Sequence, residues 1–101
     1  MLRVMRFVWD AAKAESNARR HGVTFEEASG LLRRGEDVLE IYDEAHSHDE
    51  DRFIAIGRTQ RRILCVVFTE REEDVVRIIS ARRATQTEER LYESHLHGGL
   101  S

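Results

Sequence analysis

The chain has 101 residues, a net charge of −3 and a hydrophobic fraction of 41%, which suffice for one domain, residues 1–101, with one modest core. This charge argues against a generic nucleic-acid binder. No stretch approaches the ~18 apolar residues of a membrane helix, and the N-terminus lacks a signal-peptide pattern. We therefore expect a cytoplasmic protein without a membrane partner. Cys65, the single cysteine, excludes an intrachain disulfide and is predicted to be a buried structural thiol.

The hydrophobic pattern and the capping residues predict eight elements. Asp10, Thr24 and Thr85 have the character of helix N-caps, and Gly22 and Gly35 end the first two helices. In chain order the elements are a strand over residues 6–9, helices over 11–20 and 25–34, strands over 38–42, 53–56, 63–68 and 75–81, and a helix that follows Thr85.

This order, β-α-α-β-β-β-β-α, predicts an α+β fold. Consecutive strands joined by short turns favour an antiparallel sheet with the helices packed on one face. Residues 63–68 are apolar throughout, as expected of a central strand that is buried on both faces. Residues 96–101 are predicted to be a frayed tail.

Charged residues are segregated along the chain. Residues 36–51 contain eight of the 19 acidic residues and none of the 16 basic residues, and 15 of those basic residues are arginine. The guanidinium group of arginine binds phosphate or carboxylate through two parallel hydrogen bonds. The pattern indicates a basic face beside an acidic strip, or else a genome that encodes arginine in place of lysine.

Polar residues of the first helix form one candidate surface. Lys13, Asn17 and His21 are spaced four residues apart and are expected to share a helix face. This face is suited to contact phosphate, and an ordinary solvated helix face is the alternative interpretation.

A second candidate lies in residues 46–52. In an extended segment His46 and His48 share a face, as do Glu50 and Arg52. RNA cleavage without a metal needs a base, an acid and cations, roles that Glu50 or a histidine, His46 and Arg52 respectively are able to fill. Two histidines among carboxylates also suit zinc or manganese, and a solvated polar loop is the third interpretation.

The last predicted strand contributes a third candidate. Arg77 lies among apolar residues, so it needs either a carboxylate partner or an open anion-binding concavity. Arg82 and Arg83 lie between the strand end and the next helix, where a helix N-terminus favours phosphate. The alternative is a structural ion pair with Glu88 or Glu89.

Three segments of the chain share the order and spacing of one known family. They are Phe7-Val8-Trp9-Asp10 with Lys13, Asn17, His21-Gly22-Val23, Phe25 and Ala28; Glu50-Asp51-Arg52-Phe53 leading to Ile56-Gly57; and residues 77–85 followed by Glu88, Arg90 and Tyr92. Together, over about residues 5–92, they resemble the BrnT toxins of type II toxin–antitoxin systems. The family pattern begins near Met5, which leaves residues 1–4 as an N-terminal extension.

The resemblance implies a RelE-like fold and a metal-independent endoribonuclease that cleaves RNA by attack of a 2′-hydroxyl and inhibits translation, with no cofactor. It implies neutralisation by a BrnA-like ribbon-helix-helix antitoxin that covers the active face, so that operator DNA is reached only through the antitoxin. A non-catalytic protein that binds the antitoxin and acts as co-repressor is the competing hypothesis.

The matched positions give the candidate catalytic residues and their roles. The implied roles are phosphate steering for Lys13, acid chemistry for His46, base chemistry for Glu50, and charge stabilisation for Arg52, Arg82 and Arg83.

Overall fold

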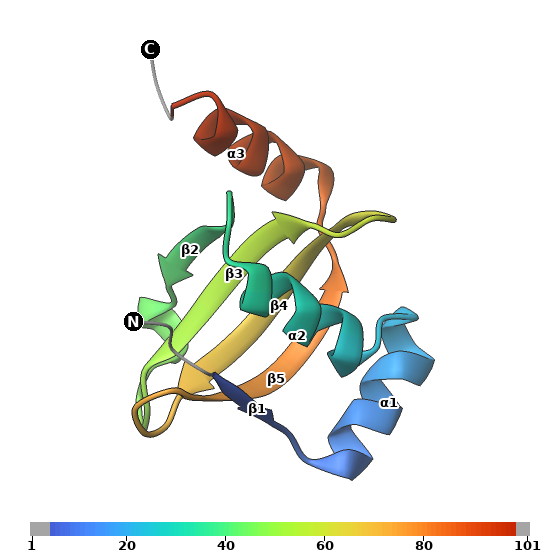
Figure 1. The fold of residues 1–101 in the computed structure, drawn as a ribbon, viewed down its shortest axis with the longest axis vertical. Helices are drawn as coiled ribbons and strands as arrows, with labels where there is room; N and C mark the ends of the chain where they lie inside the picture. The colour runs from blue at the N-terminus through green and yellow to red at the C-terminus, as the bar shows by residue number, and fades with distance from the viewer. Residues whose placement is uncertain (1–4, 99–101) are drawn as a thin grey trace.

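The computed structural model describes residues 5–98 of the chain. One short strand and two helices come first, and four more strands and a last helix follow (Figure 1). The elements are β1 Arg6–Val8, α1 Ala11–His21, α2 Phe25–Arg34, β2 Leu39–Tyr42, the 3₁₀ turn η1 Glu44–His46, β3 Arg52–Arg58, β4 Ile63–Glu70, β5 Val75–Arg83 and α3 Gln86–Leu96. The predicted α+β order is confirmed, and β5 ends at Arg83 rather than at residue 81.

The strands form one five-stranded sheet in the order β1-β5-β4-β3-β2. Strands β2 to β5 are antiparallel neighbours, whereas β1 pairs in parallel with β5. The prediction of a purely antiparallel sheet is therefore wrong. Short turns dictate the direction of consecutive strands, but β1 and β5 are joined through the whole intervening chain, so no local pattern specifies their relative direction.

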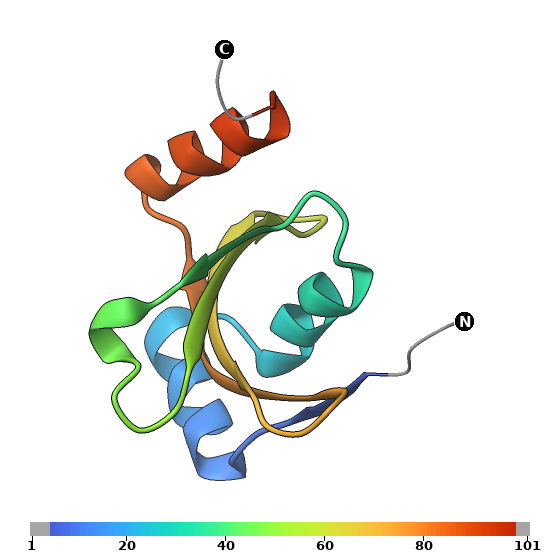
Figure 2. The ribbon, with the colours of Figure 1, turned by 90° about the vertical axis from the view of Figure 1, so that its left-hand side faces the viewer.

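The two faces of the sheet are covered differently. Helix α2 lies inside the curve of the sheet (Figure 2) and packs Phe25, Ala28 and Leu31 into the main core. Helix α3 contributes Tyr92 to a smaller cluster with Ile56, Ile63 and Cys65. Strand side chains alternate between faces, so the main core and this smaller cluster lie on opposite sides.

The prediction that the helices share one face is therefore also wrong, because α3 packs on the side away from α2. The sequence gives each helix an apolar stripe but does not say which side of the sheet receives it. As expected, Cys65 is a buried free thiol, and burial raises its pKa to about 11.

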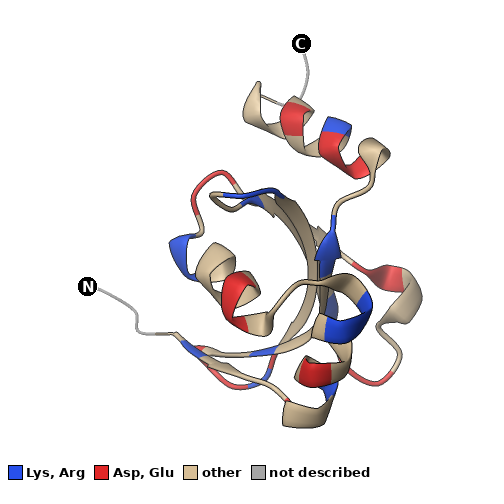
Figure 3. Ribbon diagram, turned by 90° about the vertical axis from the view of Figure 1, so that its right-hand side faces the viewer, with Lys and Arg blue, Asp and Glu red and all other residues tan. Residues whose placement is uncertain are grey.

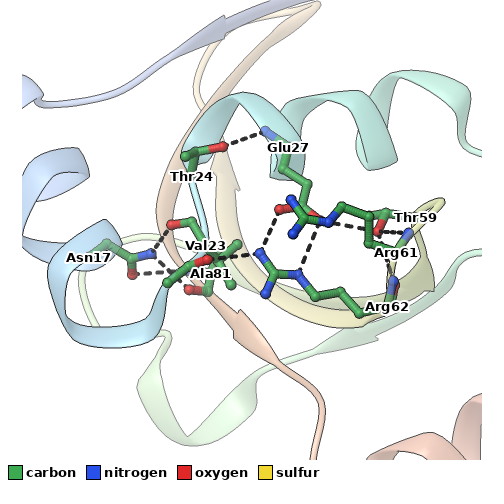
Figure 4. Close-up of polar contacts among 9 residues, drawn as sticks. Asn17, Val23, Thr24, Glu27, Thr59, Arg61, Arg62 and Ala81 are labelled. Carbon is green, nitrogen blue, oxygen red and sulfur yellow. Dashed lines mark hydrogen bonds and ion pairs between the residues drawn. The ribbon is translucent and has the colours of Figure 1, made fainter.

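The predicted helix caps are formed. Asp10, Thr24 and Thr85 each accept a hydrogen bond from the backbone N–H three residues later. At Thr85 the reciprocal bond from the Thr85 N–H to Glu88 completes a capping box. At Thr24 only the first bond is present, since the Glu27 carboxylate binds Arg62 on the β3–β4 turn instead (Figure 4). Hydrogen bonds from Arg62 are the main reason that the pKa of Glu27 is lowered.

Asn17 holds α1 against β5 (Figure 4). Its amide donates to the carbonyls of Val23 and Ala81, at 3.0 and 2.8 Å, and its oxygen accepts the Ala81 N–H at 3.1 Å. Strand β1 ends opposite Arg77, so the Asn17 amide takes the place of a neighbouring strand at Ala81. The expected exposed stripe of Lys13, Asn17 and His21 is therefore interrupted by a buried residue.

Two of the terminal predictions concern residues outside the described range. The N-terminal extension, residues 1–4, lies there, as do the last three residues of the predicted tail. Leu96, where the frayed tail was expected to begin, is the last residue of α3.

Candidate active site on the open face of the sheet

The sheet face away from α2, which we call the open face, is covered by α3 around Ile63 and Cys65. One row of polar side chains crosses this face. Arg52 on β3 pairs with Thr69 on β4, and Thr69 pairs with Arg77 on β5. Cross-strand partners project to the same face, and the flanking residues Phe53 and Phe68 pack in the main core on the other face. The register therefore brings Arg52 and Arg77 to within two strand spacings, about 10 Å, of each other.

The loop before β3 adds a carboxylate to this row. Glu50 Oε1 accepts a hydrogen bond from Nη2 of Arg77 at 2.6 Å, and the two side chains are 36% and 24% exposed. Arg77 thus has the carboxylate partner that its position among apolar residues demanded, and Glu50 is oriented by it.

A hollow of about 240 Å³ lies beside this ion pair, and we call it the β3 hollow. It is lined by His46, His48, Asp49, Glu50 and Arg52. The structure therefore brings together three of the six candidate catalytic residues, His46, Glu50 and Arg52.

Hydrogen bonds between the Ser47 side chain and the backbone fix the shape of the loop around the β3 hollow. The Ser47 hydroxyl donates to the Asp43 carbonyl at 2.6 Å and accepts the Arg52 N–H at 2.9 Å, which ties η1 to the start of β3. His46 is exposed, with Nδ1 3.0 Å from a carboxylate oxygen of Asp43. That contact leaves the other ring nitrogen of His46 free to face a ligand in the hollow.

Arg82 lies on the same sheet face but at its other end. Its register partner on β4 is Cys65, four residues along that strand from Thr69. Arg82 therefore lies about 13 Å along the strands from the row that contains Thr69. Both terminal nitrogens of Arg82 donate to Glu88 at 2.8 Å, as the structural alternative anticipated. Hydrogen bonds from Arg82, aided by the Thr85 backbone, lower the pKa of Glu88 to about 2.

Lys13 and Arg83 are exposed and do not line the β3 hollow. Lys13 lies in the first turn of α1. Arg83 follows Arg82 on β5 and pairs with the core residue Leu64, so strand alternation directs it to the face opposite Arg82. Figure 3 shows basic residues on α1 and at the end of β5, and acidic residues around η1.

Sequence reasoning identified Arg77 as a cation in need of a partner but did not identify Thr69. A threonine in an apolar strand is ordinary, and its place between two arginines depends on the register of three strands. Within residues 5–98 no group of three or more His, Cys, Asp or Glu side chains is arranged to hold a metal ion. The helices of the same residues include none that is long and apolar enough to cross a membrane.

A small α+β protein with arginines on a sheet face, and a carboxylate and histidines in the adjoining loop, has the groups that bind a phosphodiester and move protons during its cleavage. Comparison with protein-family models gives a match over residues 9–88 to the family described as "Ribonuclease toxin, BrnT, of type II toxin-antitoxin system". The chain belongs to this BrnT family of ribonuclease toxins.

A solved structure supports the assignment. The crystal structure of the Brucella abortus ribonuclease toxin BrnT superposes with a TM-score of 0.63 and 26% sequence identity, over 82% of this chain and 100% of that chain. Among curated proteins none matches this chain.

Proposed function

We propose that this chain is the toxin of a type II toxin–antitoxin module and a metal-independent endoribonuclease that acts in the cytoplasm and inhibits translation. The observation that carries the proposal is the convergence of Glu50, His46 and Arg52 on one hollow. The RelE-like fold that the family resemblance implies is part of this proposal. The family description supports a ribonuclease toxin in general terms.

The reaction that fits these groups is a transesterification, in which the neighbouring 2′-oxygen replaces the 5′-oxygen on the phosphorus of the RNA backbone. Glu50 accepts the proton of the 2′-hydroxyl as that oxygen attacks phosphorus. His46, protonated, donates a proton to the 5′-oxygen as the P–O5′ bond breaks. The products are a 2′,3′-cyclic phosphate and a 5′-hydroxyl, and Arg52 stabilises the extra negative charge on the phosphorane.

The remaining candidates contribute outside the β3 hollow. We assign Arg82 to charge stabilisation for the part of the RNA that runs along the sheet towards α3. Lys13 and Arg83 are assigned to attraction of the RNA backbone, a role that tolerates distance and exposure and weakens with salt. A BrnA-like ribbon-helix-helix antitoxin that covers the open face would neutralise the toxin, and operator DNA would be bound only through that antitoxin.

The test is induced expression of wild type, Arg52→Ala and Glu50→Gln, with growth and total RNA followed together. We expect arrest and RNA decay with wild type and their loss in both variants while each protein remains folded. Purified wild type is expected to cleave RNA equally well with and without a chelator.

Intact RNA with folded wild-type protein that still binds its antitoxin tightly would contradict the proposal and favour the non-catalytic co-repressor. Activity abolished by the chelator and restored by a divalent metal would instead favour a metal-dependent hydrolase whose metal is bound by His46 and His48.

A further inference from the structure

Two buried polar atoms next to the β3 hollow have no hydrogen-bond partner. They are Nε of Arg77 and Oγ1 of Thr69, and within residues 5–98 no other buried side-chain polar atom lacks one. Thr69 is 1% exposed, so its hydroxyl is not open to bulk solvent. Buried donors and acceptors without partners are rare in folded proteins, and each calls for an explanation such as a functional role.

The two unpartnered atoms belong to neighbouring side chains. Thr69 and Arg77 are directly opposite each other on β4 and β5, so their Cβ atoms are about 4.5–5.5 Å apart on the same face. One is an N–H donor and the other a hydroxyl that accepts, so they are chemically complementary. In the present arrangement Arg77 instead directs Nη2 at Glu50, 2.6 Å away.

We propose that Arg77 is the phosphate-binding residue of this site and that Glu50 occupies its guanidinium only until an RNA phosphate displaces it. This inference rests on the proposed ribonuclease function and names the subsite that receives the phosphodiester. The phosphate takes the terminal nitrogens of Arg77, and the guanidinium settles towards the sheet so that Nε–H donates to Thr69 Oγ1. Thr69 is a positioning residue that acts through Arg77.

The exchange has a chemical consequence for Glu50. In the structure Oε1 of Glu50 is engaged by Nη2 of Arg77, 2.6 Å away, so this oxygen does not face a substrate hydroxyl. Transfer of Arg77 from Glu50 to the substrate phosphate frees Glu50 beside the 2′-hydroxyl and adds a cation where the phosphorane charge develops. Binding of the substrate therefore releases a carboxylate oxygen of Glu50 to accept the proton of the 2′-hydroxyl.

The test measures binding separately from cleavage, with a fully 2′-O-methylated RNA oligonucleotide, which has no 2′-hydroxyl to attack phosphorus. We expect Arg77→Gln to weaken binding of this oligonucleotide at least about tenfold, the effect of losing a charge-assisted hydrogen bond pair. Arg77→Lys keeps the charge but cannot form two parallel hydrogen bonds, so its affinity for the oligonucleotide should lie between those of wild type and Arg77→Gln. Arg19→Gln is the matched control, since Arg19 also pairs with a glutamate, Glu15, on the exposed surface of α1.

The opposite change is expected for the competing carboxylate. Glu50→Gln should bind the oligonucleotide several-fold more tightly than wild type, and more tightly than Asp49→Asn. Asp49 lines the same hollow and its replacement removes the same charge, but no contact joins it to Arg77. Thr69→Val should weaken binding several-fold, whereas Thr69→Ser, which keeps the hydroxyl, should not.

The proposal is overturned if folded Arg77→Gln or Arg77→Lys binds like Arg19→Gln, or if Glu50→Gln binds no more tightly than Asp49→Asn. Cleavage of unmodified RNA by wild type, followed in parallel, separates the two claims. Wild type that cleaves while Arg77 proves irrelevant to binding refutes the subsite alone. Wild type that binds through Arg77 without cleaving refutes the ribonuclease function alone.

Discussion

Arg82 and Glu88 join the last strand to the helix that follows it. Both carboxylate oxygens of Glu88 accept from Arg82 at 2.8 Å, and Oε1 also accepts the N–H of Thr85 at 2.8 Å. One carboxylate thus completes the cap of α3 and neutralises an arginine of the open sheet face. The contact fixes where α3 begins relative to β5, and it gives the stability of the protein a specific dependence on pH.

Glu88→Gln should lower the free energy of unfolding by about 1–2 kcal/mol at neutral pH, less than the pKa shift implies because Arg82 is 40% exposed and screened by solvent. The folded pKa of Glu88 is lowered to about 2 from an ordinary 4.5. The stabilisation is therefore complete above pH 4.5 and disappears as the pH falls to about 2.

Chemical denaturation of wild type and Glu88→Gln between pH 2 and 7 measures this difference. Glu93→Gln, on the exposed side of the same helix, is the control and should leave the curve almost unchanged. A difference between wild type and Glu88→Gln that stays constant through the acid range would show that the ion pair does not stabilise the fold.

Arg82→Ala should reduce RNA cleavage about tenfold, because Arg82 is assigned to the RNA that runs towards α3 and lies about 13 Å along the strands from Thr69. Arg83→Ala should change it only a few-fold, because Arg83 projects from the opposite face of β5. Single-turnover cleavage of one RNA substrate by the purified proteins measures both effects.

The Glu88→Gln variant separates two explanations for a loss of cleavage in Arg82→Ala. It breaks the ion pair and leaves the arginine in place, so it should retain most of the cleavage activity. An equal loss in Arg82→Ala and Glu88→Gln would mean that Arg82 acts only by anchoring α3.

Asn17→Ala should destabilise the protein by about 2–3 kcal/mol. The substitution removes three hydrogen bonds and leaves the N–H and carbonyl of Ala81 without a partner at the edge of β5. Thermal and chemical unfolding measure the loss, with the exposed neighbour Ser16→Ala as control. Near-equal stability of the two variants would mean that water replaces the Asn17 amide at no cost.

Gly57→Ala should destabilise the protein by about 1–3 kcal/mol through overpacking. A Cβ at this position would lie 2.8 Å from Cδ1 of Leu31 and 3.2 Å from Cγ2 of Val38. Because Leu31→Ala removes the closest atom, the double variant should lose less stability than the two single losses added together. If chemical denaturation shows that the two single stability losses simply add in the double variant, the backbone moves to accommodate the new Cβ and Leu31 is not the obstacle.

The local features of the fold could be predicted from the sequence. The caps at Asp10, Thr24 and Thr85 and the glycine at position 22 follow from residues that are three or four apart, so the sequence specifies them directly. The same holds for the loop 46–52, where neighbours along the chain line the β3 hollow.

Features that join distant segments could not be predicted. The parallel direction of β1, the burial of Asn17 and the position of α3 on the second face each depend on contacts across tens of residues. Helical spacing alone placed Asn17 with Lys13 and His21 on an exposed stripe. Beyond the end of β1, the backbone N–H and carbonyl of Ala81 on β5 have no neighbouring strand to bond. The Asn17 amide supplies their acceptor and donor, and it is buried there as a result.

The sequence by itself determined the α+β order, the helix ends, the buried Cys65 thiol and the family to which the chain belongs. Only the tertiary structure decided that Glu50 contacts Arg77, that Glu88 contacts Arg82, and that Thr69 lies between two arginines. Helix caps and turns depend on neighbours along the chain, whereas ion pairs and strand register depend on which surfaces meet when the whole core closes.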